Sequence, residues 1–372
     1  MSVDTNLIKS PYKREKFTAQ QVEEIVKCTQ DPQYFIENFV WIQHPVKGRM
    51  KFDLFDFQKG LLDAYHGHRY SIALISRQMG KSTAAAAYLL WYAMFQPDST
   101  ILIAAHKYSG AQEIMARIRY MYESCPDHIR AGVTAYNKGS LEFDNGSRIV
   151  AQSTTENTGR GMSLTLVYLD EFAFVQPRIA SEFWTSLSPT LSTGGTCIAL
   201  STPYGVGNWF HKNYVEAEEG KNDFNPMKLP WTVHPERDEK WFIKETRNMS
   251  KREIAQELEC NFNASGETVV HGDDLKRILE NICEPNHRTG FDRNYWIWEQ
   301  PVEGRDYIAV ADVARGDGSD FSVCQILDLQ TMQQVAEYQG KITPDMFAPH
   351  LCSMASENNN ALLVIENNSL GI

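Results

Sequence analysis

SIALISRQMGKSTAAAAYLLWYAMF, residues 71–95, has the pattern of a buried strand, a phosphate-binding loop and a helix in direct succession. Residues 72–75 form the short apolar run that is typical of a strand in a parallel sheet. Gly80, Lys81 and Ser82 close the loop, and the Ala-rich segment after them favours a helix that ends at Gln96-Pro97. The stretch therefore predicts a nucleoside triphosphate site in an α/β protein.

Length and composition indicate a globular protein of two domains. The chain has 372 residues, of which 42% are hydrophobic and 22% are charged, so it can bury a sizeable core. The N-terminus has no apolar region of a signal peptide, and the longest apolar run, residues 84–95, is shorter than the roughly 20 residues of a membrane span. We expect a chain that is neither exported nor inserted in a membrane.

Net charge and cysteine spacing narrow the kinds of protein that this chain can be. The net charge of −11 argues against a protein that coats nucleic acid, so a DNA contact must be local or shared with other subunits. The seven cysteines form no C-x-x-C pair and no zinc-spaced cluster. This pattern suits reduced thiols in a cytosolic compartment and argues against a structural zinc site.

Apolar runs and helical periods alternate along the first 200 residues, which predicts a mostly parallel α/β sheet. Residues 205–265 are more polar and aromatic, and we expect them to form a small helical subdomain that covers the nucleotide site. The predicted division is an N-terminal segment and helix (1–45), a phosphate-loop ATPase domain (46–265), a linker (266–300) and a second domain (301–372).

The loop departs from the common G-x-x-x-x-G-K-[ST] pattern because Ile75 takes the place of the first glycine. Lys81 is expected to reach the β- and γ-phosphates and Ser82 to ligate Mg²⁺, while backbone N–H groups cradle the phosphates. The predicted ATP-binding residues are Gln58, Ser76, Arg77, Gln78, Met79, Gly80, Lys81, Ser82 and Asp170.

Two further strand ends complete the predicted ATPase site. The apolar strand 166–169 delivers Asp170 to the magnesium ion and Glu171 to a position where it can orient or deprotonate water. The strand 197–200 ends in Ser201-Thr202-Pro203, whose hydroxyls could sense the γ-phosphate and couple hydrolysis to neighbouring elements. An ordinary polar turn is the alternative for this last segment.

Two arginines compete for stabilisation of transition-state charge, Arg77 in the loop and Arg160 in a T-G-R-G-M segment. A structural ion pair is the alternative for each of them. Phe57 and Gln58, upstream of the first strand, could stack on adenine and hydrogen-bond to it. The alternative there is a packing residue followed by an exposed amide.

The motifs ISRQMGKS (75–82), VYLDEFAFV (167–175) and STP (201–203), with an F-Q pair upstream, together resemble the large terminase subunit of tailed phages, of the myovirus type. The resemblance implies an ATPase that packages double-stranded DNA into a prohead in the host cytoplasm and a C-terminal RNase H-like nuclease. It also implies docking to a portal, a small terminase subunit and a possible homo-oligomeric ring. By this resemblance Arg77 is the in-cis arginine finger, Glu171 the catalytic carboxylate, and 201–203 the coupling motif.

The second domain carries acidic residues at strand ends. Asp312 lies in an apolar strand, Glu366 follows another at 361–365, and a turn between them contains Asp317 and Asp320. Adjacent strands would make Asp312 and Glu366 half of a two-metal site. By the resemblance, they match the first two nuclease carboxylates, Asp320 an accessory one, and the metal is Mg²⁺ or Mn²⁺.

The family's last nuclease carboxylate lies on strands beyond Glu366, so we expect a partial RNase H-like fold with weak or absent cleavage. Two other functions remain open. One is a helicase-like DNA translocase, which would need a second RecA-like domain. The other is a remnant that binds ATP or a portal without hydrolysis.

Overall fold

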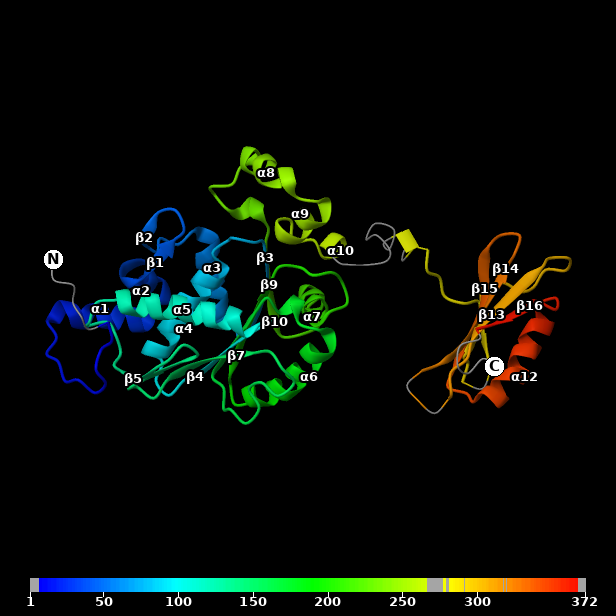
Figure 1. Ribbon diagram of the computed structural model, residues 1–372, viewed down its shortest axis with the longest axis horizontal. Coiled ribbons are helices and arrows are strands. Elements are labelled where there is room, and N and C mark those ends of the chain that lie inside the picture. Colours follow the sequence, from blue (N-terminus) through cyan, green and yellow to red (C-terminus); the bar gives the residue numbers. More distant parts are fainter. Residues whose placement is uncertain are drawn as a thin grey trace. The chain divides into compact units, whose positions relative to one another are not determined.

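The computed structural model describes residues 7–265, 277–278, 281–290, 292–316, 318 and 320–366. It divides into two compact units, unit 1 (Met1–Leu275) and unit 2 (Lys276–Ile372), and each is described by itself (Figure 1).

Unit 1 is built on an eight-stranded sheet in which six neighbouring strands, starting from one edge, run parallel, which confirms the predicted fold class. The two strands at the other edge form antiparallel pairs, and the turn at Asn145-Gly146 connects the sixth parallel strand with the first of them. The strands in spatial order are β10 (Phe224–Leu229), β3 (Tyr70–Ile75), β9 (Thr196–Ser201), β8 (Leu166–Asp170), β4 (Thr100–Ala105), β7 (Arg148–Ser153), β6 (Ser140–Phe143) and β5 (Val133–Tyr136).

Helices cover both faces of this sheet, because its central strands are apolar on both sides. Along β3, Ala73 and Ile75 belong to one hydrophobic core and Ile72 and Leu74 to the other, as the two-residue period of a strand requires. The first core holds α2 (Pro32–Phe39), α3 (Asp56–Gly67), α4 (Lys81–Phe95) and α5 (Tyr108–Ser124), and the second holds α6 (Pro177–Leu187) and α7 (Trp209–Glu218).

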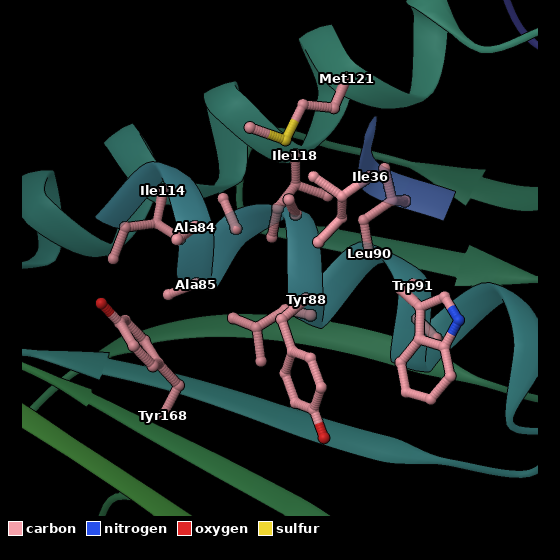
Figure 2. Packing of buried hydrophobic residues seen from close by; sticks show 14 of the residues in the cluster. Ile36, Ala84, Ala85, Tyr88, Leu90, Trp91, Ile114, Ile118, Met121 and Tyr168 are labelled. Carbon is pink, nitrogen blue, oxygen red and sulfur yellow. The ribbon is translucent and has the colours of Figure 1, made fainter. Parts of the chain in front are cut away.

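Helix α4 is buried on all sides, which is why the sequence after the loop reads as a continuous apolar run. Figure 2 shows Ile114, Ile118 and Met121 of α5 above it, and Tyr168 of the sheet on its other side. Small alanines at Ala84 and Ala85 allow this close packing. The loop before α4 is therefore anchored by a rigid core helix.

The N-terminal residues 1–45 were predicted as a separate segment, but the described part packs into unit 1. Trp91 of α4 is fully buried, and its indole N–H donates a 2.6 Å hydrogen bond to the carbonyl of Cys28 in α1 (Ala19–Gln30). The hairpin of β1 (Trp41–His44) and β2 (Gly48–Lys51) also crosses the predicted boundary at residue 45.

The helical subdomain predicted for 205–265 is smaller than expected, because α7 and β10 belong to the main layers. Asn225, Pro226 and Lys228 interrupt the apolar pattern of β10 in the sequence, but β10 is an edge strand, where proline is tolerated. What remains is the lid segment, defined here as residues 231–264. It contains α8 (Glu239–Glu245), α9 (Lys251–Glu257) and the start of α10 (Phe262–Ser265), with short 3₁₀ turns at Trp231–Val233 and Thr246–Asn248.

Unit 2 is a second sheet, and among its described residues one long helix packs against it. Three antiparallel strands are followed by α12 (Pro344–Glu357) and by a strand parallel to the first of them, which fits the beginning of the expected RNase H-like fold. The order is β11 (His287–Thr289), β12 (Tyr295–Ile297), β15 (Gln333–Gly340), β14 (Ser322–Asp328), β13 (Tyr307–Asp312) and β16 (Leu362–Ile365).

The linker predicted for 266–300 is wrong in its second half, because β11 pairs with β12 and β12 pairs with β15 inside this sheet. Each has only three residues, too few for a recognisable alternation.

Two expectations from composition can be compared with the described residues. All seven cysteines are free thiols, as their spacing indicates. Within the described ranges, we find no helix with the length and apolar character that crossing a membrane requires.

Candidate functional site

The predicted ATPase residues meet at one edge of the large sheet, where the parallel strands β3, β9 and β8 end. Leu74 pairs with Ser201, and Leu169 pairs with Ala199, so the phosphate loop, the Ser-Thr-Pro segment and the acidic pair leave the sheet side by side. This carboxyl edge is the usual ligand-binding side of open α/β sheets. The phosphate loop is defined here as residues 76–81.

The phosphate loop has the backbone shape of an anion-binding nest. Gln78 and Gly80 have left-handed conformations, with φ of 56° and 71°. Among the described residues, no acceptor meets the N–H groups of residues 78–82, which open into the first turn of α4. A side chain at Gly80 would clash, since an added Cβ would lie 2.6 Å from Nε2 of Gln58.

Gln58 is buried, and both ends of its amide are engaged within the protein. Its Oε1 accepts a hydrogen bond from the backbone of Phe55, and its Nε2 donates one of 3.1 Å to the carbonyl of Met79. The amide thus braces the phosphate loop, and this geometry does not favour the predicted hydrogen bond to adenine. Phe57 stacks on Phe55 and lies against His234.

Lys81 and Glu171 form the central ion pair of the site. Nζ of Lys81 lies 2.7 Å from Oε1 of Glu171, and the lysine side chain is almost wholly buried. The ammonium nevertheless makes no well-directed hydrogen bond to any described residue. Buried ammonium groups need such partners, so this position is suited to an additional anion.

Glu171 also contacts the third strand end. Its Oε2 accepts hydrogen bonds from the Ser201 hydroxyl at 3.3 Å and the Thr202 backbone N–H at 3.2 Å. The backbone of Glu171 has a φ of 50°, a left-handed conformation that residues other than glycine rarely adopt. Such a conformation often marks a functional position. One carboxylate therefore connects the phosphate loop with the Ser-Thr-Pro segment, whose Pro203 is buried.

Asp170 is buried one residue before Glu171. Burial raises the pKa of its carboxyl to about 6, and the negative charge of Glu171 contributes to the rise. Tyr168 lies on the same face of β8, two residues earlier, and donates a 2.9 Å hydrogen bond to Oδ1 of Asp170. A divalent cation would favour the ionised carboxylate, which is the form that ligates metals.

The two candidate arginines have different surroundings. The side chain of Arg77 is 67% exposed, and its Nη1 lies 3.3 Å from Oε2 of Glu257 in the lid segment. Arg160 is exposed between two glycines of left-handed conformation, and its Nη1 donates to Asn157.

The residues present fit a nucleoside triphosphate with Mg²⁺. The free N–H groups and the poorly bonded ammonium of Lys81 offer positive charge to phosphates, while the Ser82 hydroxyl and the Asp170 carboxylate are oxygen ligands of the kind that Mg²⁺ takes. The hydroxyl of Ser82 is in the first turn of α4, directly after Lys81.

In unit 2, Asp312 and Glu366 are neighbours on adjacent parallel strands. Ala311 pairs with Ile365, and the N–H of Glu366 donates to the carbonyl of Ala311 at 2.9 Å. Asp320 is exposed, and Asp317 lies outside the described residues. Among the residues that the structure describes, no three or more acidic, histidine or cysteine side chains gather into a possible metal site.

Several contacts at the site involve residues that the sequence did not single out. Arg237 of the lid segment donates to two carbonyls of the phosphate loop, and Arg117 of α5 donates to Thr83 at 3.0 Å. Neither lies in a recognisable motif. Only the three-dimensional fold brings their segments to the loop.

Comparison with known proteins identifies a protein family and two sequence relatives. The model of the family described as "Terminase large subunit, T4likevirus-type, N-terminal" matches residues 72–277. The large terminase subunit of Thermus virus P23-45 is 27% identical over 293 residues, covering 70% of this chain and 57% of the relative. The corresponding subunit of Thermus phage G20c gives the same values. The chain thus spans 57% of the length of these relatives.

A solved structure extends the likeness in fold to most of the chain. The large terminase of the HK97 bacteriophage aligns with 91% of this chain and 74% of its own, with a TM-score of 0.55 and 16% sequence identity. At this identity the likeness concerns the fold alone.

Proposed function

The chain belongs to the family of T4likevirus-type terminase large subunits, and from this premise we propose that unit 1 hydrolyses ATP to drive double-stranded viral DNA into a prohead. The observation that carries the proposal is the contact of Glu171 with Lys81, with the Ser201 hydroxyl and with the Thr202 backbone N–H. Through these contacts the Glu171 carboxylate connects the phosphate loop with the Ser-Thr-Pro segment, so a change at Lys81 can reach that segment.

In the proposed reaction, Lys81 exchanges its carboxylate partner for phosphate oxygens, and the N–H groups of residues 78–82 bind the same anion. Glu171 is thereby released from Lys81 and becomes the group that orients the attacking water and accepts its proton. Ser201 and Thr202 lose or change their bonds to Glu171 at this step, which gives the Ser-Thr-Pro segment its coupling role. Mg²⁺, held by Ser82 and Asp170, would neutralise charge on the phosphates.

Arg77 is the proposed arginine finger, with Arg160 as the alternative. Arg77 belongs to the phosphate loop itself, but it must leave Glu257 in order to reach a phosphate. Arg160 is exposed, and its Nη1 donates a 3.0 Å hydrogen bond to Oδ1 of Asn157. Substitution of each arginine in turn by alanine distinguishes them, because loss of a finger lowers kcat by about 10³ or more.

The partners proposed with this function are double-stranded DNA, a portal protein and a small terminase subunit, in a homo-oligomeric ring in the host cytoplasm. The net charge of −11 supports local DNA contacts rather than a wrapped duplex. A helicase-like translocase is less well supported, since the sheet of unit 2 mixes parallel and antiparallel strands in the order of an RNase H-like fold.

For unit 2 we propose a role in DNA cleavage through Asp312 and Glu366, with Asp320 as an accessory residue and Mg²⁺ or Mn²⁺ as the metal. The neighbouring positions of Asp312 and Glu366 support a shared ion.

The function is tested by measuring ATP turnover by the full chain with and without double-stranded DNA, beside Lys81→Ala. We expect DNA to raise turnover and Lys81→Ala to abolish it. ATP binding without turnover, with DNA and a small subunit present, would instead favour the non-hydrolysing binding protein.

A further inference from the structure

Arg237 contacts the outer side of the phosphate loop. Its Nη2 donates a 2.7 Å hydrogen bond to the carbonyl of Gln78, and Nη1 donates one of 3.3 Å to the carbonyl of Arg77. Nε2 of Gln58 donates to the next carbonyl, that of Met79. Three consecutive loop carbonyls are therefore bonded to side chains from outside the loop.

These carbonyls belong to the same peptide units as the N–H groups of the proposed phosphate cradle. The carbonyl of Arg77 shares a planar peptide with the N–H of Gln78, and the carbonyl of Gln78 shares one with the N–H of Met79. A donor that holds the oxygen on the outer side keeps the N–H on the inner side. A guanidinium also polarises the peptide, because it stays charged at any ordinary pH.

Arg237 is itself held in place. Its guanidinium carbon lies 4.4 Å from the centre of the Trp241 ring, in a cation–π contact, and the backbone N–H of Trp241 is capped by Asp238 at the start of α8. Both Arg237 and Trp241 belong to the lid segment, whose helices α8 and α9 are labelled beside each other in Figure 1.

The lid segment contacts the beginning of the loop as well. The carbonyl of Glu257 accepts hydrogen bonds from the N–H of Arg77 at 2.7 Å and from the hydroxyl of Ser76 at 2.9 Å. Residues 76–78 are thus fixed by two parts of the lid segment. The shape of the loop depends on the position of the lid segment, and Arg237 supplies the only charged donors among the described contacts to its carbonyls.

We propose that Arg237 is a positioning residue that preorganises the phosphate loop, so that its N–H groups face the di- or triphosphate of a nucleotide. The proposal rests on the function proposed above. It assigns to Arg237 an effect on phosphate affinity that passes through the loop backbone, without direct contact with the nucleotide. Preorganisation strengthens binding because the loop then loses less conformational freedom when the anion arrives.

The test compares Arg237→Met, Arg237→Lys and the exposed control Arg247→Met in the full chain, by calorimetric titration with ATP, pyrophosphate and adenosine. Arg237→Met should weaken ATP and pyrophosphate by a similar factor, about tenfold or more, because charged hydrogen bonds to the loop are lost. Adenosine binding should stay unchanged. Arg237→Lys, which retains one charged donor group, should fall between Arg237→Met and wild type, and Arg247→Met should equal wild type.

Wild-type affinity for pyrophosphate in Arg237→Met would overturn the proposal, provided that Lys81→Ala loses binding in the same series. Equal weakening of adenosine and pyrophosphate would also overturn it, because it would indicate general damage to the domain. If Arg237→Met does not fold, Arg237→Lys decides, and its wild-type affinity would contradict the proposal. Absence of ATP binding by the wild-type chain would refute the proposed function itself, so the two failures are distinguishable.

Discussion

Glu171→Gln tests the ion pair at the centre of the site. The change keeps the size of the side chain but removes the carboxylate 2.7 Å from Nζ of Lys81, so a lysine that is only 8% exposed loses its counter-charge. Breaking a fully buried pair costs about 3–5 kcal/mol. The Glu171 side chain is 35% exposed, so water screens the pair and we reduce the expected loss to about 1–2 kcal/mol.

The loss of the ion pair lowers the stability of the free protein, but it should strengthen ATP binding. In the wild-type chain, Lys81 must give up Glu171 before it binds phosphate, and in the variant it need not. The same 1–2 kcal/mol should therefore appear as ATP affinity, a factor of about 5–30. Turnover should nevertheless fall by roughly 10²–10⁴, because glutamine cannot accept a proton from water.

Thermal unfolding with and without MgATP, titration with ATP and steady-state turnover measure the three effects. Without nucleotide, the melting temperature should fall by about 2–8 °C, and MgATP should stabilise the variant more than the wild type. Glu216→Gln, an exposed carboxyl on α7, is the matched control and should change nothing. Unchanged melting and unchanged ATP affinity in Glu171→Gln would refute the ion-pair reasoning, and unchanged turnover would refute the catalytic role.

Three further changes have expected outcomes. Burial raises the pKa of Asp170 to about 6 from an ordinary value of 3.8, so the folded chain binds this proton more tightly than the unfolded chain does. In metal-free buffer, stability should fall as pH rises from about 4 to 6, and Asp170→Asn should remove this fall and gain roughly 2 kcal/mol at pH 7, which urea unfolding at several pH values checks. Trp91→Phe leaves the buried carbonyl of Cys28 without its donor and should cost about 1–3 kcal/mol in urea unfolding; no loss would contradict the anchoring of α1 to α4. Gly80→Ala introduces both a clash with Gln58 and an unfavourable φ, so titration should detect strongly weakened ATP binding in a chain that still folds.

The parallel core of unit 1 could be predicted because burial on both faces leaves a clear signature. Strands β3, β4, β8 and β9 are short runs of apolar residues, and α4 follows its loop without a break. Strand β10 could not be found in this way, because it is a partly exposed edge strand whose apolar run is interrupted by Asn225, Pro226 and Lys228. Strands β11 and β12 escaped for a different reason, since three residues carry no measurable period.

The residues of the candidate site also differ in whether a local sequence pattern locates them. Lys81, Asp170 and Glu171 could be predicted because each belongs to a local motif at a strand end. The roles of Gln58 and Arg237 depend on contacts across 21 and 159 residues of sequence, which no local pattern encodes. The F-Q pair in the sequence singled out Gln58 as a residue of the site. The structure shows that both ends of its amide are hydrogen-bonded within the protein.

The most direct test of the account is the rate of Mg²⁺-dependent phosphate release from ATP by the full chain, compared with Lys81→Ala and Glu171→Ala. We predict turnover by the wild type that both substitutions abolish, because one removes the phosphate-binding cation and the other the group that activates water. Turnover that persists in either variant would contradict the assignment of this sheet edge as the hydrolytic site.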